Sequence, residues 1–442
     1  MNPTVRRAGA FGAVGALALA APLLGRAAIL PFVLVAAGAL AITHGPLFEL
    51  FARPADREAG RLRGLFDFAL AATVLGGLSV FGDLPVTVFA GSVLLVAIGN
   101  LGAEVVSVRS SVAPTLGFLA AGAAGAAVGI AGAALLAGDQ IAAGSLLLLC
   151  LTGALVGALV RSMLFPRDEP PVLFTVGLVL WFLAAVDAGA DPTAVAVAVA
   201  VMVVFGVLSY ALDTASLEGV LAGVLLGLVT IVLAGYEWFA LLLTFFGVGG
   251  LATKFRYETK LERGVAEENG GNRGGVNVLA NSLVAVGAVC GLAAIEAGLV
   301  ESPTALVPFA FAGAVATALG DTLSSEIGGA FDGTRLITSF EKVPPGTDGA
   351  VTWQGTLAGA LGTATIGVLA FVAFPDVAML GAVVVAIGGA TGMTVDSVLG
   401  ATAEGRLLGN AGVNFAATLA GALAAAGIAV ALGLVTVTGL AL

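Results

Sequence analysis

Residues 304–328 read TALVPFAFAGAVATALGDTLSSEIG, an apolar run that ends in carboxylates and hydroxyls. From Thr304 to Gly320 the run has no charged residue and is rich in alanine. It predicts a membrane-spanning helix, because a crossing of the bilayer core takes about 20 mainly apolar residues. Ionisable groups are costly at membrane depth, so the polar residues after Gly320 indicate a functional site at one end of that helix.

Similar apolar runs recur along the whole chain, and about 15 can be placed. They lie at 8–24, 27–48, 65–81, 84–103, 113–137, 140–160, 171–187, 192–208, 217–234, 237–252, 275–299, 304–320, 351–374, 377–394 and 412–439. Of the 442 residues, 59% are apolar and only 10% are charged, against about 25% charged in soluble proteins. We therefore predict an all-α, polytopic membrane bundle. The composition excludes a soluble enzyme, a disordered chain and a nucleic-acid binder.

Cysteine and histidine are too scarce for several common kinds of site. Cys150 and Cys290 both lie inside apolar runs, and His44 is the single histidine. The sequence therefore argues against a disulfide framework and a thiolate metal site, and it excludes a multi-histidine metal centre. The 64 glycines predict closely packed helices, because small residues let helix backbones approach each other in lipid.

The distribution of basic residues predicts the topology. With the N-terminus inside and 15 crossings, every lysine and arginine except Arg26 falls on the inner side, as the positive-inside rule requires. We expect a multi-pass protein of the cell membrane with its active site on the cytoplasmic face. The chain is predicted to divide into residues 1–207, a transmembrane bundle of unknown role, and residues 208–442, which carry the chemistry. Three long inner segments lie in that second part: 253–274, 321–350 and 395–411.

An acidic cluster follows the apolar run 304–320. In a helix Asp321 lies above Ser324 and Ser325, and Glu326 adds a second carboxylate. Such oxygen-rich clusters suit Mg²⁺, which proteins usually hold with one or two carboxylates plus substrate phosphates. Asp396 lies at the inner end of another run, where it could face Asp321 across the bundle. The alternative is a polar helix end that simply faces water.

The segment after this cluster is rich in glycine and proline. Its turns can point backbone N–H groups at phosphate oxygens, near Gly346 and Thr347. Arg335 and Lys342 could add electrostatic clamps. The chain contains no P-loop motif, so a nucleotide site here would be of another type. An ordinary glycine-rich loop is the alternative interpretation.

The most basic stretch of the chain is 253–277, with Lys254, Lys260 and Arg273 among its charges. These residues are candidates for binding phosphate, although basic residues beside membrane helices also follow from topology or contact with anionic lipid. Two spans then open with asparagines four residues apart, which form one polar stripe on a helix. These pairs are Asn277 with Asn281 and Asn410 with Asn414.

In this order the motifs of residues 208–440 resemble the membrane phytyl-phosphate kinase family, which includes plant vitamin E salvage enzymes and uncharacterised archaeal and bacterial relatives. The most specific motif is Gly-Asp-Thr-x-Ser-Ser-Glu-x-Gly at 320–328. The others are Ala211-Leu212-Asp213, Lys254 with Lys260 and Gly264, Arg273 with Asn277 and Asn281, Asp396-Ser397 with Gly400-Ala401, and Val413-Asn414-Phe415. Residues 1–207 lie outside the resemblance. Within them, residues 99–104 (GNLGAE) loosely repeat the pattern of 320–326, and a degenerate duplicated half is one explanation.

The resemblance implies transfer of a phosphate from a nucleoside triphosphate, with CTP as the expected donor, to phytyl or geranylgeranyl phosphate. The product would be the prenyl diphosphate. On this hypothesis the Mg²⁺ ligands are Asp321, Glu326 and Asp396. The catalytic residues are Asp321, Glu326, Lys254, Lys260 and Lys342. The residues that bind nucleotide or phosphate are Arg273, Asn277, Asn281, Ser324, Ser325, Arg335, Gly346, Thr347 and Asn414.

Two other functions use similar residues. A secondary transporter of a small or anionic solute also has glycine-rich helices and carboxylates in the membrane, but its polar groups would lie near the bilayer midplane. A lipid-phosphate cytidylyltransferase would use the same substrates and release pyrophosphate. The expected partners are an isoprenyl monophosphate, a nucleoside triphosphate and membrane lipids, with no nucleic acid. A homo-oligomer is compatible with the sequence.

Overall fold

The computed structural model describes residues 2–107, 113–163, 169–186, 189–266 and 274–436. These ranges are mostly helical, which confirms the predicted all-α membrane bundle. Within them thirteen helices are long and apolar enough to cross a membrane, and two further apolar helices are shorter. Together these helices coincide with the predicted apolar runs. The number of crossings and the side of the N-terminus stay predictions.

The two shorter helices are α3 (Leu30–Ala41) and α10 (Glu169–Ala185). At 1.5 Å per residue they extend about 18 and about 26 Å, less than the roughly 30 Å of a bilayer core. The predicted run 27–48 is divided in the structure, because α3 stops at Ala41 and Pro46 begins a new helix. Gly45, with φ at +92°, makes the turn between them.

The chain forms two compact units, Met1–Val197 and Ala198–Leu442. The boundary falls inside helix α11 (Pro192–Ala211), whereas the sequence analysis divided the chain after residue 207. Besides α3 and α10, the first unit contains α1 (Pro3–Gly15), η1 (Ala16–Ala20), α2 (Ala21–Leu24), η2 (Gly25–Ala27), α4 (Pro46–Phe51), α5 (Pro54–Ala59), α6 (Arg63–Phe81), α7 (Val86–Val106), α8 (Ala113–Ala137) and α9 (Ala143–Met163).

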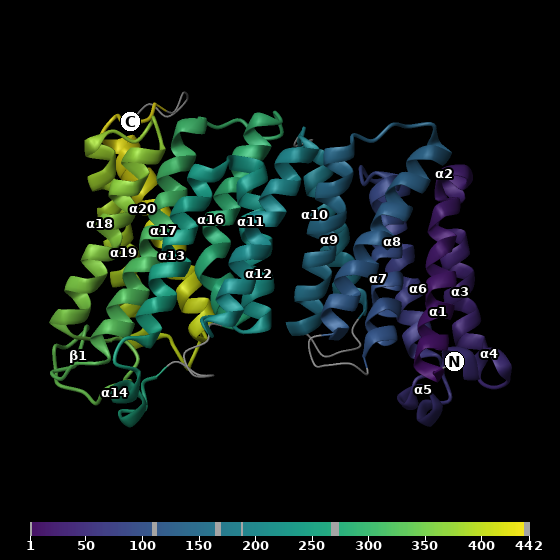
Figure 1. Cartoon of the computed structure of the whole chain (residues 1–442), viewed down its shortest axis with the longest axis horizontal. Helices are drawn as coiled ribbons and strands as arrows, with labels where there is room; N and C mark the ends of the chain where they lie inside the picture. The colour runs from purple at the N-terminus through teal and green to yellow at the C-terminus, as the bar shows by residue number, and fades with distance from the viewer. Residues whose placement is uncertain (1, 108–112, 164–168, 187–188, 267–273, 437–442) are drawn as a thin grey trace. The chain divides into compact units, whose positions relative to one another are not determined.

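Helix α17 (Val307–Gly328) is the centre of the second unit (Figure 1). It is largely buried and packs against α13, α16, α18, α19 and α20. The helix continues past the end of its apolar run to Gly328, so Asp321 and Glu326 lie on its last two turns. The other elements of this unit are α12 (Leu217–Ala234), α13 (Tyr236–Lys254), α14 (Tyr257–Glu262), α16 (Gly275–Glu296), η3 (Thr304–Leu306), β1 (Arg335–Leu336), β2 (Ala350–Val351), α18 (Trp353–Ala373), α19 (Met379–Thr402) and α20 (Asn410–Ala431).

Glycines let the neighbouring helices approach the backbone of α17. A Cβ atom at Gly421 of α20 would lie 1.9 Å from the Oγ1 of Thr317, which is fully buried. A Cβ atom at Gly359 of α18 would lie 2.7 Å from the carbonyl oxygen of Gly320. In lipid, such close packing of small residues replaces the hydrophobic drive that water supplies to soluble proteins.

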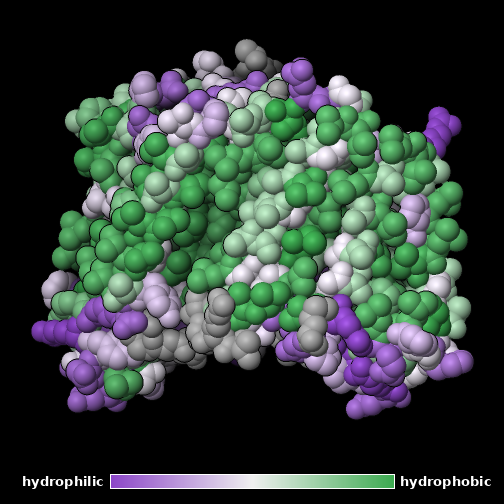
Figure 2. Space-filling model, turned by 45° about the vertical axis from the view of Figure 1, so that its right-hand side comes forward, coloured by the Kyte–Doolittle hydropathy of each residue, from purple (hydrophilic) through white to green (hydrophobic). Residues whose placement is uncertain are grey.

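The polar connections of the second unit gather at one end of its helices, where Figure 1 shows α14 and β1. Strands β1 and β2 pair antiparallel, with Arg335 opposite Val351. The loop that contains them lies directly on α19, because a Cβ atom at Gly349 would be 2.4 Å from the carbonyl oxygen of Ser397. In Figure 2 hydrophobic side chains cover the middle of the visible face, and hydrophilic ones gather at its upper and lower edges.

The contact at Gly421 gives a direct test of this packing. Gly421→Ala should lower the melting temperature in detergent by several degrees, because overpacking a tight contact costs about 1–3 kcal/mol. Gly427→Ala is the matched control on the same helix, since a Cβ atom there would meet nothing within 4 Å. Equal melting temperatures for the two variants would contradict the packing described for α17 and α20.

Candidate functional site

A cavity of about 470 Å³ opens at the polar end of the second unit. Its walls come from the ends of α16, α17, α19 and α20, and from the loop between α17 and α18. Ten of the residues predicted to act in the site line it. They are Asn277, Asn281, Asp321, Ser324, Ser325, Glu326, Gly346, Thr347, Asp396 and Asn414. The structure therefore brings together side chains that lie up to 137 positions apart, from 277 to 414.

The last turns of α17 supply three hydroxyls and two of the carboxylates of this cavity, from Thr322, Ser324, Ser325, Asp321 and Glu326. Asp321, Ser324 and Ser325 line it as the predicted helical spacing requires. The Oγ of Ser325 donates a hydrogen bond to the carbonyl oxygen of Thr322, at 3.1 Å. Its hydroxyl oxygen can still accept a hydrogen bond, and rotation of the side chain would redirect its proton to a ligand.

The two asparagine pairs begin α16 and α20 and line the same cavity. In α16 the Nδ2 of Asn281 donates to the carbonyl oxygen of Asn277 at 3.0 Å. Asn281 and Asn414 are buried, whereas Asn410 is exposed at the rim. The sequence pattern revealed both pairs, but only the fold places them beside the acidic end of α17.

Asp396 of α19 lies opposite Asp321 of α17, as predicted, and the two side chains are in hydrogen-bonding contact. The Oδ1 atom of Asp396 is buried without a hydrogen-bond partner. Two adjacent carboxylates repel each other unless a proton or a cation lies between them. Oxygen ligands from two carboxylates, one with an unsatisfied atom, fit Mg²⁺ that is completed by substrate phosphates.

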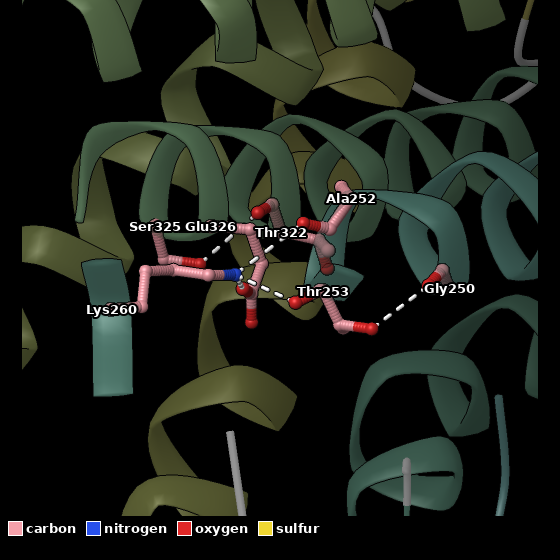
Figure 3. Close-up of polar contacts among 7 residues, drawn as sticks. All are labelled: Gly250, Ala252, Thr253, Lys260, Thr322, Ser325 and Glu326. Atoms are coloured by element: carbon pink, nitrogen blue, oxygen red, sulfur yellow. Dashed lines mark hydrogen bonds and ion pairs between the residues drawn. The ribbon is translucent and has the colours of Figure 1, made fainter. Parts of the chain in front are cut away.

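Glu326, the third predicted metal ligand, forms an ion pair with a lysine. It pairs with Lys260, whose Nζ also donates to the carbonyl oxygens of Thr253, at 2.8 Å, and Ala252, at 3.4 Å (Figure 3). Within the described ranges no three acidic, cysteine or histidine side chains are grouped so that they could hold a metal ion. Asp321 and Asp396 are therefore the two carboxylates positioned to bind a cation.

Lys260 lies behind the wall of the cavity. Its side chain is fully buried and does not line the cavity, although it had been predicted to be catalytic. By binding carbonyl oxygens at the end of α13 and the carboxylate of Glu326, it joins α13 and α14 to α17. A buried ammonium needs such partners because desolvation of an unpaired charge is expensive.

The other predicted basic residues that the structure describes do not line the cavity. Lys254 is half-buried at the end of α13, while Arg335 and Lys342 are exposed and face each other across a β-bridge. The Nη1 of Arg335 donates to the carbonyl oxygen of Phe340 at 2.6 Å. Arg273 lies outside the described residues. In this loop only Gly346, with φ at +81°, and Thr347 line the cavity as predicted.

The cavity is strongly acidic. Asp348 and Glu404 line it together with Asp321, Glu326 and Asp396, and none of its described lining residues is lysine or arginine. Burial and the negative charges of Asp348 and Asp396 raise the pKa of Glu404 above its usual value. A polyphosphate could enter such a cavity only with cations that offset the repulsion.

Asp348, Glu404 and Asn410 were not predicted as site residues. The sequence held a signal for two of them, because Asp348 lies in the glycine-rich loop and Asn410 precedes Asn414 by four positions. Glu404 had no such signal. It reaches the cavity because a turn with a bridge between Glu404 and Leu408 follows α19.

The Lys260–Glu326 pair yields a stability prediction. Lys260→Met should destabilise the protein by about 3–5 kcal/mol, because it leaves Glu326 as an uncompensated buried charge. Adding Glu326→Leu should recover much of that loss, since the charge is then removed as well. Thermal unfolding in detergent measures both changes, and Lys342→Met is the control at an exposed lysine. No recovery in the double variant would show that Lys260 acts independently of Glu326.

The comparisons with known proteins identify the family of the chain. The family model described as Integral membrane protein DUF92 matches residues 200–422. The Uncharacterized membrane protein MJ0933 of Methanocaldococcus jannaschii is 35% identical over 212 residues, 47% of this chain and 82% of that protein. Protein VTE6, chloroplastic, of Arabidopsis thaliana is 39% identical over 147 residues, 33% of this chain and 44% of that protein. Protein PGR of the same plant is 35% identical over 215 residues, 44% of this chain and 74% of that protein.

No solved structure matches the chain. The match to Protein VTE6 spans less than half the length of that protein. The family match contains the whole described lining of the acidic cavity, from Gly264 to Asn414. The chain therefore belongs to the DUF92 family of integral membrane proteins, and the resemblance identified from its C-terminal motifs is confirmed.

Proposed function

We propose that the protein is an isoprenyl-phosphate kinase of the membrane. It transfers the terminal phosphate of a nucleoside triphosphate, with CTP as the expected donor, to phytyl or geranylgeranyl phosphate. The observation that carries the proposal is the pairing of Asp321 with Asp396 in an acidic cavity at the polar end of membrane helices. Family membership and the likeness to Protein VTE6 support it.

Phosphate transfer to a phosphate monoester needs no strong general base. A phosphate monoester carries about −1.5 to −2 charge at pH 7, so its attacking oxygen is already largely deprotonated. That oxygen bonds to the γ-phosphorus, the bond from γ-phosphorus to the β–γ bridging oxygen breaks, and the nucleoside diphosphate leaves with the electron pair. Catalysis then depends on aligning two polyanions and offsetting their charge.

Asp321 and Asp396 would hold the Mg²⁺ that accompanies the nucleotide. When bound, the ion neutralises phosphate charge and polarises the phosphoryl group. The hydroxyls of Ser324, Ser325 and Thr347 can turn toward phosphoryl oxygens. The amides of Asn281 and Asn414 provide donors from the opposite wall. Glu326 is kept in place and neutralised by Lys260, so it contributes less repulsion to an entering phosphate.

The position of the cavity suits a substrate with a lipid tail. The cavity lies where apolar helices end, so a polar headgroup can meet a soluble nucleotide there while its prenyl chain stays among the helices. A transporter would place its polar groups near the middle of the membrane. The acidic and amide groups described here instead lie at one end of α16, α17, α19 and α20.

The assay uses purified protein in detergent with Mg²⁺, geranylgeranyl or phytyl phosphate, and CTP labelled at the α or the γ position. We expect γ-label in the prenyl diphosphate and no α-label in the lipid, and EDTA should abolish the transfer. Appearance of α-label in the lipid would instead establish cytidylyltransfer. Absence of transfer from CTP and ATP to either lipid would reject both transferase activities.

Asp321→Asn and Asp396→Asn should each lower the transfer rate by about 100-fold or more, because each removes a charge that positions the cation and the phosphate. Asp376→Asn is the matched control, since Asp376 is exposed in the connection between α18 and α19. Unchanged melting temperatures would separate loss of function from loss of fold. Full activity in Asp396→Asn would remove the carboxylate pair from the mechanism.

A further inference from the structure

Two buried amide side chains line the acidic cavity, Asn281 of α16 and Asn414 of α20. Their exposed fractions are 5% and 7%, and α16 packs directly against α20. A polar group that is buried without hydrogen bonds costs free energy. The amide atoms that lack a partner within the protein therefore indicate which kind of ligand the cavity binds.

The hydrogen bonds of Asn281 fix the orientation of its amide. Its Nδ2 donates to the backbone carbonyl oxygen of Asn277 at 3.0 Å, and it lies 3.4 Å from the Oδ1 of the same residue. A backbone carbonyl only accepts, so the atom beside it must be the NH₂ group. The Oδ1 atom of Asn281 consequently points away from Asn277, and no described residue donates to it. Asn281 thus holds a hydrogen-bond acceptor in a fixed position in the cavity wall.

Asn414 has both ends of its amide available. Its backbone carbonyl oxygen accepts from the Oγ1 of Thr418 at 2.9 Å. In the part of the chain that the structure describes, its side chain makes no hydrogen bond, although 93% of the residue is buried. An amide has a carbonyl oxygen that accepts and an NH₂ group that donates. Asn414 therefore suits a ligand that donates and accepts side by side, and rotation about χ2 exchanges the two positions.

Phosphate groups can satisfy only the N–H groups of these amides. An ionised phosphoryl oxygen accepts hydrogen bonds but has no hydrogen to donate to the Oδ1 atoms of Asn281 and Asn414. A nucleoside triphosphate carries its donors elsewhere, on the ribose hydroxyls and on the nucleobase. An exocyclic amino group supplies two N–H donors from one nitrogen atom, which matches two acceptor oxygens on neighbouring helices.

We propose that Asn281 and Asn414 bind the nucleobase and select cytosine, which carries an amino group, over uracil, which carries a carbonyl oxygen in its place. The inference rests on the proposed function in one respect, that the cavity takes a nucleoside triphosphate. The amino group of cytosine donates to both Oδ1 atoms, and the Nδ2 of Asn414 donates to the ring nitrogen N3. The cavity volume of about 470 Å³ is within the usual range for small-molecule sites, about 300–1,000 Å³.

Selectivity comes from Asn281, because its amide cannot turn. Uracil has a carbonyl oxygen at position 4 and an N–H at N3, and rotation of the Asn414 amide would pair with both. At Asn281 the uracil oxygen would meet another acceptor, since Asn277 holds the amide in place. Leaving a buried acceptor unpaired should cost about tenfold or more in affinity. Adenine has the same amino group beside an unprotonated ring nitrogen, so this pair of amides does not separate it from cytosine.

The test is isothermal titration calorimetry of the full-length protein in detergent with Mg²⁺, without a lipid acceptor. We expect CTP to bind about tenfold or more tightly than UTP, and dCTP to bind as CTP does. Asn281→Leu should bring the affinities for CTP and UTP to within about threefold of each other, because the fixed acceptor is lost. A damaged fold would weaken both nucleotides together, so the ratio isolates recognition of the base.

Ser282→Ala is the matched control, because Ser282 is the buried neighbour of Asn281 and does not line the cavity. It should keep the wild-type ratio. Binding of none of the three nucleotides would reject the nucleotide site, and with it the proposed function and this inference. Equal binding of CTP and UTP, or a preference for CTP that persists in Asn281→Leu, would overturn the inference and leave the nucleotide site in place. A preference for CTP over dCTP that Asn281→Leu removes would assign the Oδ1 atom to the ribose and also overturn it.

Discussion

The cavity of the second unit depends on one constraint, the contact between two carboxylates at the ends of membrane helices. Asp321 and Asp396 can lie together only because small residues let α19 approach α17, and glycines at the helix contacts make that approach possible. Their mutual repulsion must be offset by a cation or a proton. Lys260 neutralises Glu326. The aspartate pair is therefore the position where binding of a cation is most favourable.

The two units differ in the charge of their described cavities. At the end of α17 the described lining is acidic and attracts cations, whereas at the end of α7 three arginines line a smaller cavity together with Glu104 and Glu169. The excess of carboxylates in the second unit is what makes its cavity a candidate for a cation. Under the proposed function, a polyphosphate would enter that cavity together with its metal ion.

The sequence was sufficient for the membrane class, for the helical architecture and for ten of the residues that line the acidic cavity. Apolar runs and ordered polar motifs are local patterns, so Asp321, Asp396 and the asparagines could be found before the fold was known. The function of the basic residues could not be predicted in this way. Lys260 and Lys342 look alike in sequence, but one is buried against Glu326 and the other is exposed. Glu404 enters the site only through a turn after α19.

The most direct measurement of the central claim is electron paramagnetic resonance of Mn²⁺ titrated into the protein with and without CTP. Mn²⁺ replaces Mg²⁺ at carboxylate sites and reports its own coordination. The account predicts one bound Mn²⁺ whose affinity rises with CTP, and loss of that signal in Asp396→Asn but not in Asp376→Asn. Equal Mn²⁺ binding by both variants, or no change on adding CTP, would contradict the assignment of Asp321 and Asp396 to a cation that carries the nucleotide.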